Sequence, residues 1–244
     1  MQLSPDPEPI ISLLKNTLSK SHATGFIIGI SGGIDSAVSA SLCVRATGST
    51  AVTGIFLPSK VTPDTDYNDV ILLTEKLGIN IITVPIEDII SKYKNLPDFE
   101  ETPYLIGNLM ARTRMTILYY YANRLNRLVC GTSNYTEFLL GYCTKFGDNA
   151  ADVQPIIHLS KSEVWDLAGT LGVPDKIIKR TPTAGLWQNQ TDEGELGMTY
   201  AEIDNSIIHL EKQLWIPETE IERKIMDRIL RAGHKQQPAP QIKR

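Results

Sequence analysis

The chain has 244 residues, and its 42% hydrophobic and 21% charged content is the ordinary balance of a globular protein. This length suits a single α/β domain, residues 1–244, with a sizeable core. The net charge of −4, without a long basic run, argues against general nucleic-acid binding, and no apolar stretch reaches the ~18 residues of a membrane span.

The cysteines argue against both a zinc site and a redox pair. Cys43, Cys130 and Cys143 are far apart, and none belongs to a CxxC motif. Cys43 and Cys130 stand in apolar stretches, so we expect both to be buried as small hydrophobic side chains. The N-terminus lacks the basic start and apolar core of a signal peptide. We therefore expect a cytoplasmic protein in a reducing compartment.

Strands and helices alternate through the first part of the chain. Apolar residues at helical spacing predict helices, and short apolar runs rich in β-branched residues predict strands. The alternation, with short links, predicts an α/β fold: a Rossmann-like, doubly wound parallel sheet flanked by helices. The predicted order is helix 7–20, strand 26–30, helix from 37, strand 51–57, helix 65–77, strand 80–84 and helix 86–94.

The longest helical pattern in the chain covers residues 104–126. Its apolar faces are wider than one core contact needs. A strand over 127–132 follows it. A further helix is predicted over 160–171, and Gly172 is a suitable residue to end it.

The C-terminal part contains two helices and two segments without periodicity. Because 182–197 has few apolar residues, we expect a mobile loop at about 183–197. Helices are predicted at 199–212 and 217–232. The tail, residues 233–244, shows neither a helical nor a strand pattern, and we expect it to be mobile without ligand.

Residues 29–36 read Gly-Ile-Ser-Gly-Gly-Ile-Asp-Ser and join the first strand to the next helix. Glycines allow the backbone to approach an anion, and the loop N–H groups, the Ser31 and Ser36 hydroxyls and the positive helix end face one spot. This suits a phosphate or pyrophosphate, although the motif is neither Walker A nor GxGxxG. Asp35 fits beside a phosphate if a divalent cation lies between them. An ordinary tight strand-to-helix turn is the alternative.

A second polar group follows the last predicted strand. Glu137 comes just past that strand, and ligands of open parallel sheets bind at the rim formed by the strands' carboxyl ends. With Asp35, Glu137 could hold Mg²⁺; otherwise it is a solvated carboxylate in the first turn of a helix. Lys145 could hold a phosphate or a substrate carboxylate, or lie free at the surface. Asp148 and Asp152 could accept hydrogen bonds from ribose or amine groups.

The string Ser-Gly-Gly-Ile-Asp-Ser resembles the pyrophosphate loop of the ATP pyrophosphatase superfamily, of adenine nucleotide α-hydrolase-like fold, whose members cleave ATP between the α and β phosphates. With the strings at 108–115, 131–137, 141–155 and 190–204, the chain resembles NAD synthetases of the ammonia-dependent type from about residue 10 to residue 240. The resemblance implies a ligase that amidates deamido-NAD to NAD through an adenylate, releasing AMP and pyrophosphate. No further domain of nitrilase or glutaminase size is seen, so free ammonia is the expected nitrogen source.

The resemblance also implies roles for the matching positions, and a homodimer with the dinucleotide site across its interface. Asp35 and Glu137 would bind Mg²⁺. The catalytic residues would be Asp35, Lys145, Asp148 and Asp152, and either Asp148 or Asp152 could receive the proton that ammonium loses. The ATP-binding residues would be Gly29, Ile30, Ser31, Gly32, Gly33, Ile34, Asp35, Ser36, Thr132, Lys161 and Thr183. The deamido-NAD-binding residues would be Asn108, Arg112, Tyr142, Lys145, Asp152, His234 and Lys235.

Ordinary explanations exist for several of these residues, and two positions depart from the family pattern. Arg112 could belong to a solvated helix face, and Lys161 could merely decorate a helix start. Many relatives have Asp where Gly185 stands, and the tail usually has Arg where Gln236 stands. Both departures remove a contact, so closure of the loop and the tail is expected to be weaker.

Two other function classes compete with this interpretation. A different ATP pyrophosphatase, such as a tRNA thiolation enzyme, would favour a catalytic cysteine pair and a basic RNA surface, and neither is evident. A nucleotide-binding regulatory module would not need turnover. The presence of Asp35, Glu137 and Lys145 together argues against it.

Overall fold

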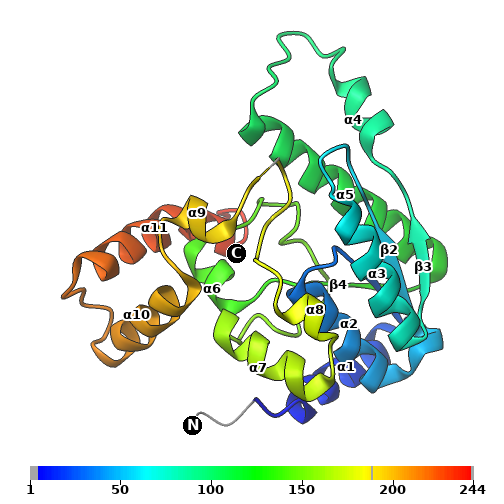
Figure 1. Cartoon of the computed structure of the whole chain (residues 1–244), viewed down its shortest axis with the longest axis horizontal. Coiled ribbons are helices and arrows are strands. Elements are labelled where there is room, and N and C mark those ends of the chain that lie inside the picture. The colour runs from blue at the N-terminus through cyan, green and yellow to red at the C-terminus, as the bar shows by residue number, and fades with distance from the viewer. Residues whose placement is uncertain (1–4, 188, 243–244) are drawn as a thin grey trace.

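The computed structural model describes residues 5–187 and 189–242. At its centre lies a parallel sheet of four strands in the order β3-β2-β1-β4 (Figure 1). The strands are β1 (Phe26–Gly29), β2 (Val52–Phe56), β3 (Asn80–Thr83) and β4 (Leu128–Cys130). The chain builds β1, β2 and β3 outward in one direction and then returns to place β4 on the other side of β1. The switch point of this sheet, where ligands bind in such folds, lies between β1 and β4.

Helices cover both faces of the sheet, as predicted. Phe26 and Ile28 of β1 point into one core, whereas Ile27 points into the other, because side chains alternate along a strand. The first core contains residues of α1 (Glu8–Ser21), α2 (Ile34–Thr47), α3 (Asp64–Leu77) and α7 (Lys161–Leu171). The second contains residues of α4 (Glu87–Tyr93) and α5 (Pro103–Leu125). The prediction of a parallel α/β sheet flanked by helices is confirmed.

A third hydrophobic cluster lies beside the sheet, at the left of Figure 1. It joins α6 (Tyr135–Leu140), α9 (Asp192–Leu196), α10 (Tyr200–Lys212) and α11 (Glu220–Gln236). Trp165 of α7 packs against both this cluster and the first core. The C-terminal helices are therefore tied to the sheet through α6 and α7.

The prediction of a loop over 182–197 is wrong in its second half. The Thr191 hydroxyl accepts a hydrogen bond from the N–H of Gly194 and so starts α9, which ends at Gly197 in the left-handed conformation (φ +71°). The same signals of cap and glycine are present in the sequence, but a five-residue helix is too short to show a hydrophobic period. Two other short elements, the 3₁₀ turn Ser49–Ala51 and α8 (Asp175–Ile178), were not predicted for the same reason.

The prediction for the tail is also wrong at its start, because α11 continues through Gln236 rather than ending at residue 232. Gly233 interrupts the sequence pattern but not the helix, and Pro238 follows soon after the helix ends. Gln236 donates from Nε2 to the carbonyls of Phe138 (2.8 Å) and Leu139 (3.0 Å). This glutamine therefore joins α11 to the C-terminal end of α6, a role that an arginine contact to the dinucleotide would not supply.

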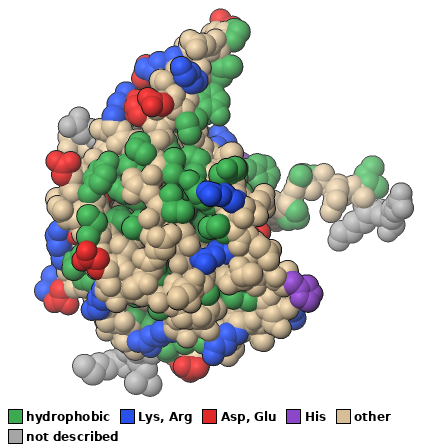
Figure 2. Space-filling model, turned by 90° about the vertical axis from the view of Figure 1, so that its right-hand side faces the viewer, with side chains coloured by type: hydrophobic (Ala, Val, Ile, Leu, Met, Phe, Trp, Pro, Cys, Tyr) green, Lys and Arg blue, Asp and Glu red, His purple; other side chains and the backbone are tan. Residues whose placement is uncertain are grey.

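Much of the surface around α5 is hydrophobic. Figure 2 views the side of the molecule that lies at the right of Figure 1, and hydrophobic side chains gather in the upper half of that face. Along α5, Tyr104, Leu105 and Tyr120 are exposed. Within the described ranges, no helix is both long and apolar enough to cross a membrane.

Candidate active site

The glycine loop stands at the carboxyl end of β1. Gly32 has φ +80°, a conformation that favours glycine, and an added Cβ there would lie 3.1 Å from the Arg180 guanidinium. The Ser31 and Ser36 hydroxyls lie 3.2 Å apart, and Ser36 also accepts a hydrogen bond from the Ser31 N–H. In the described chain no side chain caps the N-terminus of α2. The uncapped N–H groups and the helix dipole make this loop suitable for a phosphate, as the sequence predicts.

Asp35, in the first turn of α2, is joined directly to the loop that follows β4. Its Oδ1 accepts a hydrogen bond from Nδ2 of Asn134 (2.9 Å). Asn134 is also the N-cap of α6, where its Oδ1 accepts from the N–H of Glu137 (2.9 Å), and Glu137 reciprocates toward the Asn134 N–H. One asparagine therefore fixes the positions of both predicted metal-binding carboxylates. The Asn-x-x-Glu capping box that reveals it is readable in the sequence.

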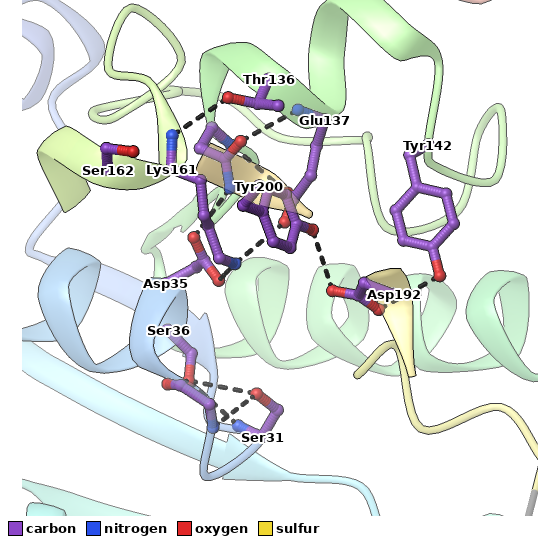
Figure 3. A network of polar contacts seen from close by, with 12 residues as sticks. Ser31, Asp35, Ser36, Thr136, Glu137, Tyr142, Lys161, Ser162, Asp192 and Tyr200 are labelled. Atoms are coloured by element: carbon purple, nitrogen blue, oxygen red, sulfur yellow. Dashed lines mark hydrogen bonds and ion pairs between the residues drawn. The ribbon is translucent and has the colours of Figure 1, made fainter. Parts of the chain in front are cut away.

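Lys161 occupies the space between these two carboxylates (Figure 3). Its Nζ lies 2.6 Å from Oδ2 of Asp35 and 3.3 Å from Oε1 of Glu137, and the residue is 1% exposed. The two acidic neighbours raise the pKa of Lys161 above its usual value, against the opposing effect of burial, so the side chain stays protonated. The alternative that Lys161 merely decorates a helix start is wrong.

This cluster carries a surplus of negative charge. Burial and the nearby Asp35 raise the pKa of Glu137 to about 8, and Asp192 acts in the same direction. The one ammonium of Lys161 lies among these three carboxylates. Additional positive charge at this spot would stabilise the ionised form of Glu137.

Asp192 enters the site from α9 and connects two tyrosines. The Tyr200 hydroxyl donates to its Oδ2 (2.9 Å), and the Tyr142 hydroxyl lies 3.1 Å from its Oδ1 (Figure 3). The Tyr200 ring lies beneath the ammonium of Lys161, 5.0 Å from its centroid. Burial and the surrounding carboxylates raise the pKa of both tyrosines, so both act as hydroxyl donors at neutral pH.

The donor set at the switch point fits Mg²⁺ only in part. Asp35 and Glu137 converge on one point, and hard oxygen ligands with surplus negative charge suit this cation. Across residues 5–187 and 189–242, however, no group of three or more His, Cys, Asp or Glu side chains forms a metal site. A magnesium ion here would therefore need further oxygens from outside the protein, such as those of a phosphate.

Four of the residues predicted to bind the dinucleotide form a second group, where α5 and the end of α11 meet the loop after α6. Arg112 of α5 donates from Nε and Nη2 to the carbonyl of Lys145, at 3.3 and 3.2 Å. The Lys145 ammonium donates to the carbonyl of His234 (2.5 Å). Lys235 donates to the carbonyls of Gly141 and Cys143 (both 2.7 Å). The structure thus brings Arg112, Lys145, His234 and Lys235 together.

The two candidate proton acceptors have other hydrogen-bond partners. Asp148 accepts from the N–H of Thr144 (2.8 Å), which shapes the loop. Asp152 accepts from the N–H of Val129 (2.7 Å) and lies 3.5 Å from the Tyr119 hydroxyl on α5. Both residues are exposed in part, but burial of its carboxyl group raises the pKa of Asp148.

The remaining predicted residues lie around these groups. Thr132 is part of the loop between β4 and α6, close in sequence to Asn134. The Thr183 hydroxyl accepts a hydrogen bond from the N–H of Gly185 (3.1 Å). The Thr183 side chain therefore holds the turn at Gly185, the position where many relatives have Asp. Asn108 donates to the carbonyl of Tyr104 (2.8 Å) within α5.

Comparison with known proteins places this site in a family. The NAD synthase family model matches residues 8–239. The chain belongs to the NAD synthase family. It is 49% identical to the "NH(3)-dependent NAD(+) synthetase" of Methanoregula boonei, over 91% of this chain and 90% of the relative. The resemblance found in the sequence is confirmed.

Solved structures from the same family agree in fold. One, titled NMN synthetase, is from Francisella tularensis; it has a TM-score of 0.89 and 38% identity, and the match covers 97% of this chain and 96% of that one. Another is the NH3-dependent NAD synthetase of Campylobacter jejuni, solved with a nitrate ion, with a TM-score of 0.83 and 28% identity over 97% of each chain.

The structure adds residues that sequence reasoning did not place in the site. These residues are Asn134, Asp192 and Tyr200, which lie within the strings at 131–137 and 190–204 that carry the family resemblance. The pairing of Lys161 with Asp35 was not predicted either. It joins positions separated by 126 residues, and no local pattern reports such a contact.

Proposed function

We propose that this protein is an ammonia-dependent NAD synthetase, a ligase that forms a C–N bond. Its substrates would be deamido-NAD, ATP and ammonia, and its products NAD, AMP and pyrophosphate. The observation that carries the proposal is the uncapped glycine loop at the switch point, beside the Asp35–Lys161–Glu137 cluster, in a chain 49% identical to a named synthetase of this kind.

The first half of the reaction would activate the nicotinate carboxylate. A carboxylate oxygen attacks the α-phosphorus of ATP, the bond from that phosphorus to the bridging oxygen breaks, and pyrophosphate leaves. The loop N–H groups and the N-terminus of α2 would hold the phosphates, with Ser31 and Ser36 as hydroxyl donors. The Lys161 ammonium would stabilise the negative charge that develops on the phosphate oxygens as pyrophosphate leaves. Thr132 and Thr183 would contact the nucleotide.

Mg²⁺ would be held by Asp35 and Glu137 together with phosphate oxygens. When bound, it would neutralise charge on the departing pyrophosphate. The protein's own contribution at this point is the surplus of negative charge described above. Because Glu137 is buried next to Asp35, an arriving cation also favours loss of any proton from Glu137.

In the second half, ammonia attacks the carbonyl carbon and AMP leaves with its electron pair. Arg112, Lys145, Tyr142, His234 and Lys235 would position the dinucleotide, together with Asn108 and Asp152. Either Asp148 or Asp152 would take the proton from ammonium. No enzyme nucleophile is needed: burial raises the pKa of the Cys143 thiol to about 12, so the reactive thiolate is scarce.

Assembly, location and segment movement complete the proposal. A homodimer formed through α5 would cover the exposed Tyr104 and Tyr120 and could complete the dinucleotide site. The protein would work in the cytoplasm, where its free thiols stay reduced. The parts of the two predicted mobile segments that are not helical, residues 183–187, 189–191 and 237–242, would close over the adenylate and exclude water from it.

The deciding experiment supplies purified protein with ATP, Mg²⁺, ammonium and deamido-NAD, and separates the nucleotides by chromatography. We expect equal amounts of NAD and AMP, and no product when glutamine replaces ammonium. A parallel reaction uses nicotinic acid mononucleotide, because one structural relative is titled NMN synthetase. Preference for the mononucleotide, or AMP release without amide formation, would contradict the proposal. Asp35→Asn should abolish turnover in a folded protein.

A further inference from the structure

Asp204 of α10 is a buried carboxylate to which no role has been given so far. It is 4% exposed, although it lies in the C-terminal helix cluster and not at a strand end. Its Oδ1 accepts a hydrogen bond from the Thr136 hydroxyl (2.5 Å). Its Oδ2 accepts from the Ser162 hydroxyl (2.6 Å) and from the Ser162 N–H (2.8 Å). A buried carboxylate with three donors is a strongly fixed group.

The two residues that Asp204 holds are the sequence neighbours of Glu137 and Lys161, two members of the candidate site. Thr136 precedes Glu137 in the first turn of α6, and Ser162 follows Lys161 in the first turn of α7. The Thr136 hydroxyl also accepts from the Lys161 N–H (3.0 Å), so it connects the two helices directly. Asp204 thus fixes the backbone on which Glu137 and Lys161 stand.

The N-terminus of α7 has no free donor to offer a phosphate. Its first three N–H groups are satisfied by the Thr136 hydroxyl, Asp204 and the Ser160 hydroxyl, through Lys161, Ser162 and Glu163 in turn. This differs from α2, which lacks a side-chain cap. The first turn of α7 therefore acts as a fixed support from which only the Lys161 side chain reaches the site.

From this arrangement we infer that Asp204 is a positioning residue for the ATP half of the reaction, acting through Thr136 and Ser162 on Glu137 and Lys161. The inference rests on the proposed function for its choice of substrates. According to this inference, the C-terminal helices have two roles. Helix α10 sets the geometry at the switch point through Asp204, and helix α11 carries His234 and Lys235. It also predicts a selective effect, because none of the three hydrogen bonds reaches the Arg112–Lys145–His234 group.

The test compares Asp204→Asn with Thr136→Val. The asparagine keeps shape and one carbonyl oxygen but removes the charge, and its amide group must face one of the donors that Asp204 now accepts from. The valine is nearly isosteric and deletes only the hydroxyl that links Asp204 to the Lys161 N–H. The matched control is Glu222→Gln, which removes a similarly buried carboxylate in the same helix cluster; Glu222 bonds with Thr219, Glu218 and His209 instead.

We expect both test variants to raise the KM for ATP and the dissociation constant of ATP at least tenfold, with the KM for deamido-NAD within twofold of the starting protein. ATP binding is measured by calorimetry without deamido-NAD, so it reports even if the chain proves to amidate another substrate. The double variant should bind ATP no less tightly than the single variant that has the lower affinity, because both substitutions interrupt the same chain of hydrogen bonds. Glu222→Gln should leave the affinity for ATP unchanged.

A merely structural role predicts something different. If Asp204 only stabilises the fold, its loss lowers the folded fraction, and ATP affinity per folded molecule stays at the starting value in both variants. That result, or an equal rise in the KM for both substrates, overturns the inference. If Asp204→Asn fails to fold, Thr136→Val decides alone, since it leaves Asp204 bonded to Ser162.

Discussion

The substitution Lys161→Met tests whether the carboxylates at the switch point depend on this cation. Methionine keeps an unbranched apolar stem and removes only the ammonium that lies 2.6 Å from Asp35 and 3.3 Å from Glu137. Removing one partner of a fully buried ion pair costs about 3–5 kcal/mol. Here the side chains of Asp35 and Glu137 are each 18% exposed, and water can solvate them in part. We therefore expect a loss of about 2–3 kcal/mol in the free energy of unfolding, which for a chain of this size lowers Tm by roughly 4–12 °C.

The loss should depend on pH in a defined direction. With Lys161 present, the pKa of Glu137 is about 8, and without the ammonium it moves further up. A carboxyl whose folded pKa exceeds its unfolded value is stabilising when protonated, and that contribution disappears as pH rises toward the folded pKa. Up to about pH 8 both proteins lose this contribution together, and above that pH only Lys161→Met continues to lose it, so the gap between the two proteins should widen from pH 8 to pH 9.

Urea unfolding followed by circular dichroism measures both effects, with and without Mg²⁺. The control Lys176→Met removes an ammonium 2.6 Å from Asp69, but that lysine is 55% exposed, and the expected loss is below about 1 kcal/mol. Mg²⁺ should restore the stability of Lys161→Met more than that of the control, because it can replace the lost charge. Equal stability of Lys161→Met and the starting protein at pH 9 without Mg²⁺ would refute the reasoning.

Three further predictions address other parts of the molecule. In Gly141→Ala the added methyl would lie 2.2 Å from Cβ of Ala232, and residue 141 has φ +59°. We therefore expect the free energy of unfolding to fall by about 1–3 kcal/mol and the KM for deamido-NAD to rise. An unchanged Tm would contradict this. Hydrogen bonds from the Thr219 backbone and from His209 lower the pKa of Glu222 to about 2. The ionised Glu222 therefore stabilises the fold fully above pH 4.5, and this contribution is lost as pH falls below that value. The Tm difference between Glu222→Gln and the starting protein should shrink from pH 7 to pH 3, and a constant difference would disprove the role of this ionisation. Tyr120→Arg places a charge on the exposed side of α5 and should convert a dimer into a monomer in sedimentation; a variant that stays dimeric would exclude Tyr120 from the interface.

The sequence predicted the sheet well because each strand carries its own signal. Phe26–Gly29 is an apolar run, and Val52–Phe56 is rich in β-branched and aromatic residues and buried along its whole length, as expected for strands covered on both faces. The errors lie where the determining contacts are short-range caps or distant side chains. Residues 192–196 form a helix through the single hydroxyl of Thr191, and α11 passes Gly233 with Gln236 bonded to the end of α6.

The candidate site was predicted in its parts but not in its connections. The glycine loop and Glu137 could be found from their place after a strand, and the rule that strand ends share a rim brings them together. Lys161 was expected in the ATP site only from the family resemblance. No rule of sequence spacing brings Lys161 to Asp35, or Asp204 to Thr136, since each pair depends on how α7 and α10 pack against the sheet and α6. Such long-range polar contacts are a consequence of the fold, and a pattern within a single element carries no information about them.

These connections fix most of the cluster in place and leave the Lys161 ammonium as its adjustable member. Asp35, Asn134 and Glu137 are anchored to strand ends and helix caps, whereas Lys161 ends in a single ammonium on a flexible stem. That ammonium can turn from the carboxylates to a phosphate without moving the backbone, because Asp204 and Thr136 hold the first turn of α7. The charge that it leaves behind, on Asp35 and Glu137, is then available to a cation that arrives with the same phosphate. ATP and its metal are thus expected to bind cooperatively, and metal binding should be weak in the absence of nucleotide.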